Sequence, residues 1–481
     1  MCNFNTRFYK NLNKIKMRKI IYIFILLIAI SSTGFTQKGA VTKEMLEQIK
    51  KSYNNNEASV KAISNAVSNN DMSKLALNRE NAGKVDHYFK YKVDVKGITD
   101  QKSSGRCWMF TGLNVLRPKV MEKYNISSFE FSTNYLFFWD QFEKANLFLQ
   151  AIIEHKDKPM NDKTVEWLFK NPIGDGGVWN SLTNLIDKYG VVPKEVMPET
   201  KNSESTRWMS RLIRRKLRED GIELRKMAEK KADVNKLQER KIEMLGDIYK
   251  MLAINLGEPP TEFNWRYKDK DGNISELKKY TPISFFKEAL PDVSFDNYIM
   301  LMNDPSRDYY KLYEIEYDRN VMEGKNWIYI NLPTDNLKKY ALTSIKNNEA
   351  MYASCDVGKQ LNKDEGLLSL QNFDYESIYG VKFGMDKKDR IISFESGSSH
   401  GMALIAVDVD KNEKPVKWQF ENSWGASSGH NGYLTFTDEW FNEYMFRVVV
   451  LKKFIDQKTL DILKTKAIKL PPWDPMYSMD F

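Results

Sequence analysis

The sequence contains few cysteines, few histidines and few turn-forming residues for its length. Three Cys among 481 residues cannot form the disulfide framework of a small secreted protein. The four His are scattered, and no His-Glu-x-x-His or paired Cys-x-x-Cys motif occurs, so neither a metal nor another cofactor is expected. Gly (24) and Pro (15) are too scarce for a collagen-like or low-complexity chain. The 42% of hydrophobic residues instead predicts a packed globular protein, and the length of 481 residues predicts two or more lobes or one domain with large insertions.

The positive charge is concentrated at one end of the chain. The formal net charge is +9, but residues 1–36 contain six of the 73 basic residues and no acidic one. The rest of the chain therefore has 67 basic against 64 acidic residues, a net charge of +3. A body this close to neutral gives little electrostatic reason to expect a nucleic-acid partner.

Residues 1–36 have the pattern of a secretory signal peptide. An 11-residue apolar run (20–30) follows Arg18-Lys19 and precedes Ser31-Ser32-Thr33-Gly34. The run is shorter than the roughly 20 residues that span a bilayer, so no stable membrane span is expected once the leader is removed. We therefore expect an exported protein, periplasmic or secreted. An uncleaved N-terminal membrane anchor is the alternative.

The order of helical and strand patterns predicts an α+β protein with a cleft between two lobes. Apolar residues at helical spacing follow position 107, charged residues alternate around a Leu/Ile/Met stripe from 203 to 256, and short β-rich runs fill the final third. The expected parts are an N-terminal segment (37–95), a helical lobe (96–200), a charged helical insertion (201–325), a β-rich lobe (326–455) and a C-terminal arm (456–481).

Cys107 is the candidate nucleophile. A Ser-Ser-Gly loop precedes it and a helical pattern follows it, so the thiol is expected in the first turn of a helix. The partial positive charge of a helix N-terminus lowers the pKa of a thiol and favours the reactive thiolate. Cys355 lies in the apolar stretch 350–355 and is expected to be a buried core thiol.

Three further residues can complete the chemistry of a thiolate nucleophile. His400 opens an apolar strand and can act as the general base. Asn422, in Glu421-Asn422-Ser423-Trp424-Gly425, can orient the imidazole, and Trp424 can shield that hydrogen bond from water. Gln101, six residues before Cys107, offers an amide donor that can stabilise an oxyanion together with the Cys107 backbone amide.

The order Gln-x5-Cys-Trp, then His, then Asn-Ser-Trp-Gly resembles the papain-like cysteine peptidases. The resemblance implies that Gln101, Cys107, His400 and Asn422 are the oxyanion-hole residue, nucleophile, general base and orienting residue. It also implies that Gly176 and Gly177 pair with the extended substrate backbone.

The spacing between Cys107 and His400 and two local sequence segments indicate one branch of that family. His400 follows Cys107 by 293 residues, against about 130–150 in ordinary papain-like enzymes, so a large insertion separates them. The segments Gln-Lys-Ser-Ser-Gly-Arg-Cys-Trp-Met-Phe and Leu470-Pro-Pro-Trp-Asp-Pro-Met476 are similar to the bleomycin hydrolase/aminopeptidase C branch.

This second resemblance carries its own expectations. It implies a papain-like fold with a helical lobe, a β-barrel-like lobe, a large helical insertion and an arm lying in the cleft. It also implies a homohexamer with an inner chamber, and peptide substrates with a free N-terminus whose amino group is captured by the terminal carboxylate of Phe481.

Two alternatives to a cysteine aminopeptidase stay open at this point. If the arm does not block the cleft, the protein is a papain-like endopeptidase. A chamber-forming binding protein that has lost catalysis is the other, and the presence of Gln101, Cys107, His400 and Asn422 argues against it.

Overall fold

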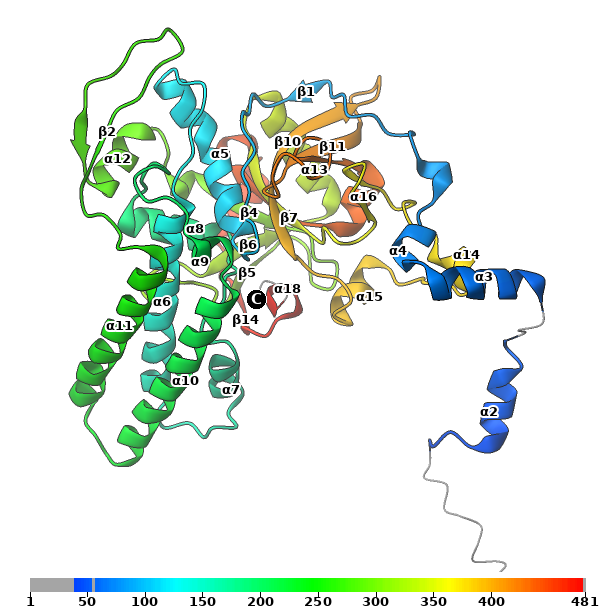
Figure 1. Ribbon diagram of the computed structural model, residues 1–481, viewed down its shortest axis with the longest axis horizontal. Helices are drawn as coiled ribbons and strands as arrows, with labels where there is room; N and C mark the ends of the chain where they lie inside the picture. Colours follow the sequence, from blue (N-terminus) through cyan, green and yellow to red (C-terminus); the bar gives the residue numbers. More distant parts are fainter. Residues whose placement is uncertain (1–38, 54–56, 479–481) are drawn as a thin grey trace, which may run out of the picture. The chain divides into compact units, whose positions relative to one another are not determined.

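The computed structural model describes residues 39–53 and 57–478 (Figure 1). The predicted signal peptide and Phe481 lie outside the described residues. The chain divides into two units, Met1–Leu75 and Ala76–Phe481. The described part of the first unit is helical, with α2 (Lys43–Lys50), α3 (Ala58–Asn69) and α4 (Met72–Leu75).

The second unit is built around one mixed sheet of twelve strands. Its strand order is β14-β5-β6-β4-β13-β7-β10-β11-β12-β9-β8, with β1 pairing to β10 beside this path. The strands are β1 (Tyr91–Lys92), β4 (Tyr298–Met302), β5 (Lys311–Ile315), β6 (Trp327–Asn331), β7 (Met351–Cys355), β8 (Leu361–Asn362), β9 (Leu367–Leu368), β10 (His400–Val409), β11 (Pro415–Glu421), β12 (Tyr433–Thr437), β13 (Met445–Leu451) and β14 (Ile468–Leu470). The central strands β7, β10 and β13 are almost wholly buried, which explains their continuous apolar sequences.

This unit also contains helices, most of them around the sheet. They are η1 (Arg79–Asn81), α5 (Cys107–Lys123), α6 (Thr133–Glu154), α7 (Lys163–Lys170), α8 (Trp179–Tyr189), α9 (Lys201–Glu204), α10 (Arg207–Glu229), α11 (Val234–Leu256), α12 (Pro282–Ala289), η2 (Phe295–Asn297), α13 (Thr334–Lys346), α14 (Tyr375–Tyr379), α15 (Lys387–Ile392), α16 (Asp438–Tyr444), η3 (Lys452–Phe454), α17 (Gln457–Leu460), η4 (Asp461–Lys464) and α18 (Pro475–Ser478).

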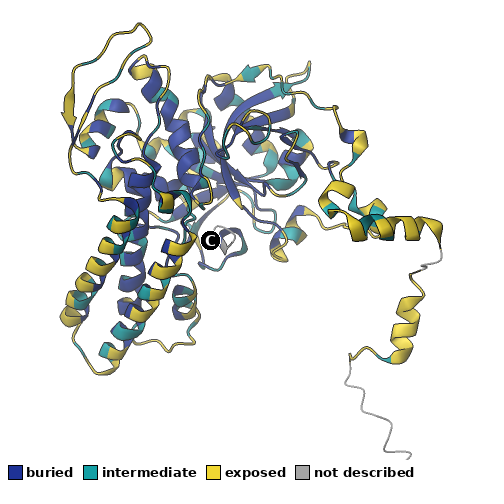
Figure 2. Ribbon diagram, viewed as in Figure 1, coloured by how far each residue is buried: buried dark blue, intermediate teal, exposed yellow. Residues whose placement is uncertain are grey.

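Helix α5 joins the helical part to the sheet. It packs against β10 and β7 on one side and against α6 and α8 on the other. Twelve of its 17 residues are buried, so it lies inside the hydrophobic core rather than on its surface. Figure 2 shows α5 and the central strands as buried, while α10 and α11 each have an exposed face. The predicted α+β class is confirmed, and α5 lies where helices and sheet meet.

Residues 201–325, the expected charged helical insertion, contain both helices and strands. Helices α10 and α11 form its first half and pack on α6. From residue 257 the chain forms the hairpin of β2 (Phe263–Trp265) and β3 (Lys278–Tyr280), and then β4 and β5, which belong to the large sheet. The long helices of the 201–325 segment therefore end at Leu256, and the short α12 and η2 follow between its strands. Short strands such as β4 depend on pairing with β13 and β6, which local sequence does not reveal.

The C-terminal arm is anchored to the sheet. Its strand β14 pairs in parallel with β5, and the following Met476 and Tyr477 are buried in a cluster with Trp327 and Tyr329. Asp474 forms a buried ion pair with Arg307. The arm is thus held in place as far as residue 477. Among residues 39–53 and 57–478, no helix is both long and apolar enough to cross a bilayer.

Candidate active site

Cys107 is the first residue of α5, as the sequence predicts. Arg106 is the N-cap residue, and no side chain caps the helix there. The thiol is partly exposed and lines a cleft of about 380 Å³ that opens to solvent. The helix N-terminus therefore places its partial positive charge at the sulfur, which favours a thiolate.

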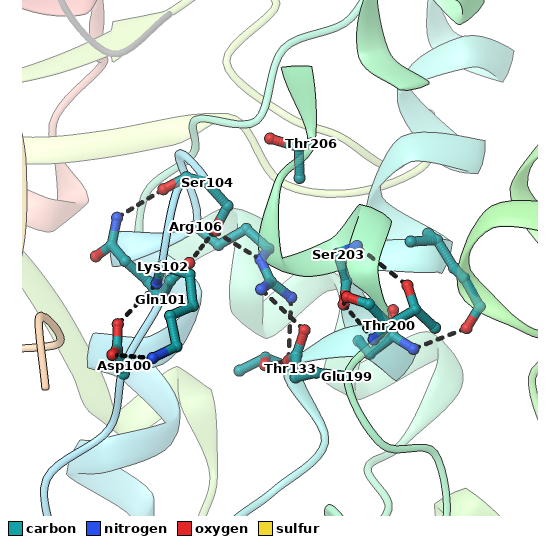
Figure 3. A network of polar contacts seen from close by, with 12 residues as sticks. Asp100, Gln101, Lys102, Ser104, Arg106, Thr133, Glu199, Thr200, Ser203 and Thr206 are labelled. Carbon is teal, nitrogen blue, oxygen red and sulfur yellow. Dashed lines mark hydrogen bonds and ion pairs between the residues drawn. The ribbon is translucent and has the colours of Figure 1, made fainter. Parts of the chain in front are cut away.

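A buried ion pair beside Cys107 fixes the loop that carries it (Figure 3). The Arg106 side chain is wholly buried, and its guanidinium lies 2.9 Å from the Glu199 carboxylate. Arg106 also donates to the Ser104 hydroxyl at 3.0 Å, and Glu199 accepts a hydrogen bond from Thr133 at the start of α6. Burial acts to raise the pKa of Glu199, but the Arg106 charge and the hydrogen bonds that the carboxylate accepts together outweigh burial and leave that pKa lowered. Sequence analysis did not find this pair, because its partners lie 93 residues apart.

Replacing Glu199 with Gln is expected to lower the free energy of unfolding by about 3 kcal/mol at pH 7, because Arg106 would keep a buried charge without a counter-charge. Since folding lowers the pKa of Glu199, its contribution is complete above the unfolded value of 4.5 and is lost as the pH falls through the folded value. The difference in the free energy of unfolding between the original chain and the Glu199→Gln variant, measured by urea unfolding, should therefore become smaller below pH 4.5.

Glu130→Gln is the matched control, because its ion pair with Lys194 is largely exposed. We expect that change to cost less than about 1 kcal/mol. Equal stability losses in the two variants would contradict the special position of Glu199.

His400 and Asn422 are hydrogen-bonded to each other. The His400 Nε2 atom lies 2.8 Å from Asn422 Oδ1, and both residues are buried. Asn422 Oδ1 also accepts the Ser423 backbone amide at 2.8 Å, and an amide N–H can only donate, so this atom is the oxygen. Nε2 must then carry the proton, which leaves Nδ1 with a lone pair. His400 can therefore accept the proton of a thiol.

Burial lowers the pKa of His400 to about 4, and the hydrogen bond to Asn422 partly opposes that shift. Trp424 packs on the imidazole with ring centroids 4.8 Å apart, where it excludes water from the hydrogen bond. The imidazole is thus neutral near pH 7 and available as a base.

Gly401 is the next residue of β10 after His400. A Cβ there would lie 3.2 Å from the Tyr352 hydroxyl and 3.5 Å from the Cα of Trp108, an ordinary van der Waals distance, so only the end of the Tyr352 side chain would be crowded by a larger residue.

Gln101 is held in the cleft by Ser423, a residue to which the sequence gave no role. Its Oε1 accepts the Ser423 hydroxyl at 2.7 Å, and its backbone amide donates to the Ser423 carbonyl at 2.8 Å. Its Nε2 donates one hydrogen to the Ser104 carbonyl at 2.7 Å. A side-chain amide has two such hydrogens, so the second can be offered to a negatively charged oxygen.

The glycine loop, residues 172–179, forms one wall of the cleft. The Trp108 indole N–H donates to the Asp175 carbonyl at 2.7 Å, and a Cβ on Gly177 would lie 2.7 Å from the Trp108 ring. Lys144 donates to the carbonyl of Gly176 at 2.6 Å. The residue after the nucleophile thus requires glycine at 177 and holds the loop beside Cys107.

The cleft brings together residues from the whole second unit. Cys107, His400, Gln101, Gly176 and Gly177 line it, while Asn422 and Trp424 support His400 from behind. Sequence analysis did not single out the other lining residues, which are Gly105, Trp108, Gly174, Asp175, Arg207, Ser210, Arg214, Tyr352, Ser354, Ser398, Ser399, Gly401 and Arg447.

Two other predictions concern residues outside the chemistry. Cys355 is buried, as expected, and burial raises its pKa well above the usual value, so it stays a protonated thiol. It lies opposite His400 in the β7–β10 pair, a proximity that the sequence did not indicate. In the part of the chain that the structure describes, no cluster of three His, Cys, Asp or Glu side chains could hold a metal ion.

The α+β fold and the cleft with Cys107, His400 and Asn422 fit a cysteine peptidase, and comparison with known proteins identifies the family. The profile of the Peptidase C1-like family matches residues 40–477. The chain is 40% identical to bleomycin hydrolase of Mus musculus over 422 residues, which covers 86% of this chain and 93% of the relative. It is 38% identical to aminopeptidase C of Lactobacillus delbrueckii subsp. lactis, covering 87% and 94%.

A solved structure agrees with these relatives. PepW from Lactobacillus rhamnosis HN001 is 35% identical and superposes with a TM-score of 0.88, covering 92% of this chain and 99% of that one. The chain belongs to the Peptidase C1-like family. The prediction of a cysteine-type aminopeptidase in the bleomycin hydrolase/aminopeptidase C branch is confirmed at the level of class.

Proposed function

We propose that this chain releases N-terminal residues from peptides through a thioester formed on Cys107. The pairing of His400 with Asn422 carries the proposal, because it leaves Nδ1 unprotonated at the cleft that Cys107 lines. His400 takes the thiol proton, and the thiolate sulfur attacks the carbonyl carbon of the scissile bond. The carbonyl oxygen becomes an oxyanion, which the Gln101 side-chain amide and the Cys107 backbone amide stabilise.

The tetrahedral intermediate then collapses. The C–N bond breaks as His400 gives its proton to the leaving amine, and the acyl group stays on sulfur as a thioester. Water attacks the thioester and gives a proton to His400, and the C–S bond breaks to release the N-terminal amino acid. His400 then returns its proton to the Cys107 thiolate, which restores the neutral imidazole and the thiol.

Gly177 is the better candidate of the two glycines for pairing with the substrate backbone. The carbonyl of Gly176 is already used by Lys144. Gly177 forms no backbone hydrogen bond among the described residues, and it lies in the cleft wall. An extended peptide can therefore pair with Gly177 in the manner of an added strand.

The position of the arm supports an exopeptidase. Arg447 lines the cleft and donates to the Met476 carbonyl at 2.5 Å, so the arm reaches a residue of the cleft wall. In this proposal the terminal carboxylate of Phe481 binds the substrate ammonium in a partly enclosed site, where an ion pair is stronger than at the surface.

Matched peptides with free and acetylated N-termini test the activity. The enzyme should release amino acids from the free peptide and cleave the acetylated copy at least about 10-fold more slowly, because acetylation removes the ammonium charge. Mass spectrometry of the products gives both rates. Internal cleavage of the acetylated peptide at the same rate would favour the endopeptidase alternative, and no cleavage of either would favour the binding protein.

The expected assembly and location are also proposals. A homohexamer with its clefts facing an inner chamber rests on the family resemblance, and light scattering of the purified protein measures its mass directly. Export rests on the basic, apolar and polar order of residues 1–36. Protein recovered from outside the cytoplasm should lack this segment by N-terminal sequencing, and an intact leader on exported protein would contradict cleavage.

A further inference from the structure

The charges around the cleft are unbalanced. Three arginines line it, Arg207, Arg214 and Arg447, and Asp175 is the only acidic lining residue in the described part of the chain. The Asp175 carboxylate accepts hydrogen bonds from the Thr206 hydroxyl, from the Ser210 hydroxyl at 3.0 Å and from the Gly105 amide at 3.3 Å. It is thus committed to positioning its neighbours, and the cleft keeps an excess of positive charge.

Arg447 is committed to the arm. It is 3% exposed, its guanidinium lies over the Trp327 ring at 3.8 Å, and it donates to the Met476 carbonyl. A guanidinium held between an aromatic ring and a backbone carbonyl is fixed in position. Arg447 therefore positions the arm. The role of the other two arginines, Arg207 and Arg214, remains to be explained.

Arg207 and Arg214 face the cleft from the first turns of α10. Arg207 is exposed and Arg214 is half-buried. No ion pair of either side chain occurs among the described residues, and the one hydrogen bond of Arg214 runs to the Ser210 carbonyl at 3.3 Å. Five other charged residues of α10 do form ion pairs: Arg215, Lys216, Glu219, Asp220 and Glu223. The start of α10 at Arg207 adds further partial positive charge.

The position of α10 indicates which part of the substrate lies near Arg207 and Arg214. Asp175 bonds to Thr206 and Ser210, and it directly precedes the Gly176-Gly177 pair, so α10 is fastened to the wall that pairs with the substrate backbone. The leaving amine lies at His400, which must protonate it. The arginines therefore border the acyl side of the scissile bond, where an aminopeptidase holds the N-terminal residue.

We propose that Arg207 and Arg214 form a subsite for an acidic side chain, so that the enzyme prefers peptides beginning with Glu or Asp over their amide counterparts. This deepens the proposed aminopeptidase activity and rests on it. A guanidinium forms two parallel hydrogen bonds with a carboxylate but has no acceptor for an amide NH₂ group, which gives the subsite its discrimination.

The test compares Glu-Ala-Ala-Ala with Gln-Ala-Ala-Ala, which differ only in side-chain charge. The full-length enzyme should have a kcat/KM for the Glu peptide about 5- to 10-fold above that for the Gln peptide at low salt, the size expected for partly exposed ion pairs. The preference should fall in 0.5 M NaCl, because salt screens exposed charges. In the double variant R207Q/R214Q the ratio should fall to about 1 or below.

Arg211→Gln is the matched control. Arg211 lies on the same helix, is exposed and does not line the cleft, and its guanidinium lies over the Trp208 ring at 5.2 Å. Its removal lowers the net charge by one, as each substitution in the double variant does, so an unchanged ratio would show that the effect is local. The charge reversal R214E should move the preference toward Lys-Ala-Ala-Ala.

Three results would overturn the subsite. The first is equal rates for the Glu and Gln peptides, and the second is a preference that R207Q/R214Q leaves intact. The third is a preference that appears only when Glu is second, in Ala-Glu-Ala-Ala against Ala-Gln-Ala-Ala. In each of these, release of amino acids from the Gln peptide shows that the aminopeptidase activity itself stands. No release from any peptide would overturn that activity as well.

Discussion

Replacing Cys107 with Ala is expected to lower kcat/KM by about 10⁴-fold or more, because no acyl intermediate can form without the sulfur. His400→Ala should cause a loss of similar size, since the thiol then has no base and the leaving amine has no acid. The double variant should be hardly worse than either single one, because residues that act as a unit do not contribute additively. Release of N-terminal residues from a free peptide measures all three.

Cys355→Ser is the matched thiol control. Cys355 is wholly buried on β7, and burial raises its pKa, so it should neither react nor contribute to turnover. Iodoacetamide should therefore label Cys107 in the folded enzyme and reach Cys355 only after unfolding. Near-normal turnover in Cys107→Ala, or inactivation caused by labelling of Cys355 alone, would show that the nucleophile lies elsewhere.

Sequence patterns predicted the parts of the fold that depend on local order. The start of α5 at Cys107 follows from a Ser-Ser-Gly loop before a helical pattern, and β10 follows from a continuous apolar run after residue 400. The strands β4, β5 and β14 were missed, because each is three to five residues long and is defined by pairing with distant strands. Local propensity carries little information about such pairing.

The candidate site shows the same division. Gln101, Cys107, His400 and Asn422 could be proposed because their chemistry and order are distinctive, and the structure gathers them around one cleft. The residues that hold them carry no such signal. The Ser423 hydroxyl that fixes Gln101 acts across 322 positions, and the Arg106–Glu199 pair joins two loops. A lone serine or arginine in a sequence does not indicate its partner.

The helical insertion contributes residues to the cleft, because the first turns of α10 line it. The sequence predicted a charged helical insertion, and its alternating charges are typical of a solvated helix face. The structure places the first turns of α10 beside the glycine loop, where Asp175 fastens them. A segment inserted between the nucleophile and the general base can thus change substrate choice and leave the chemistry intact.

Deleting residues 479–481 is expected to convert the enzyme toward internal cleavage. The deletion leaves Met476 and Tyr477 in their buried cluster and leaves the contact of Arg447 with the Met476 carbonyl, so the fold of the arm should persist. It moves the terminal carboxylate from Phe481 back to Ser478, three residues short of the position from which we propose that it binds the substrate ammonium. The ratio of kcat/KM for a free peptide over its N-acetylated copy should fall by about 10- to 100-fold, the range for losing one enclosed charge-assisted contact.

A C-terminal extension separates the carboxylate from the residues that precede it. Adding Gly-Gly after Phe481 retains every side chain of the arm but moves the negative charge, so it should weaken the preference for free N-termini as the deletion does. Thermal unfolding of both variants should match that of the original chain, because both keep Met476 and Tyr477 in their buried cluster. If the deleted enzyme still removes only free N-terminal residues, another group must bind the ammonium. Asp175 would then be the first residue to replace, although its carboxylate already accepts hydrogen bonds from its neighbours. It is the acidic residue that lines the cleft in the described part of the chain.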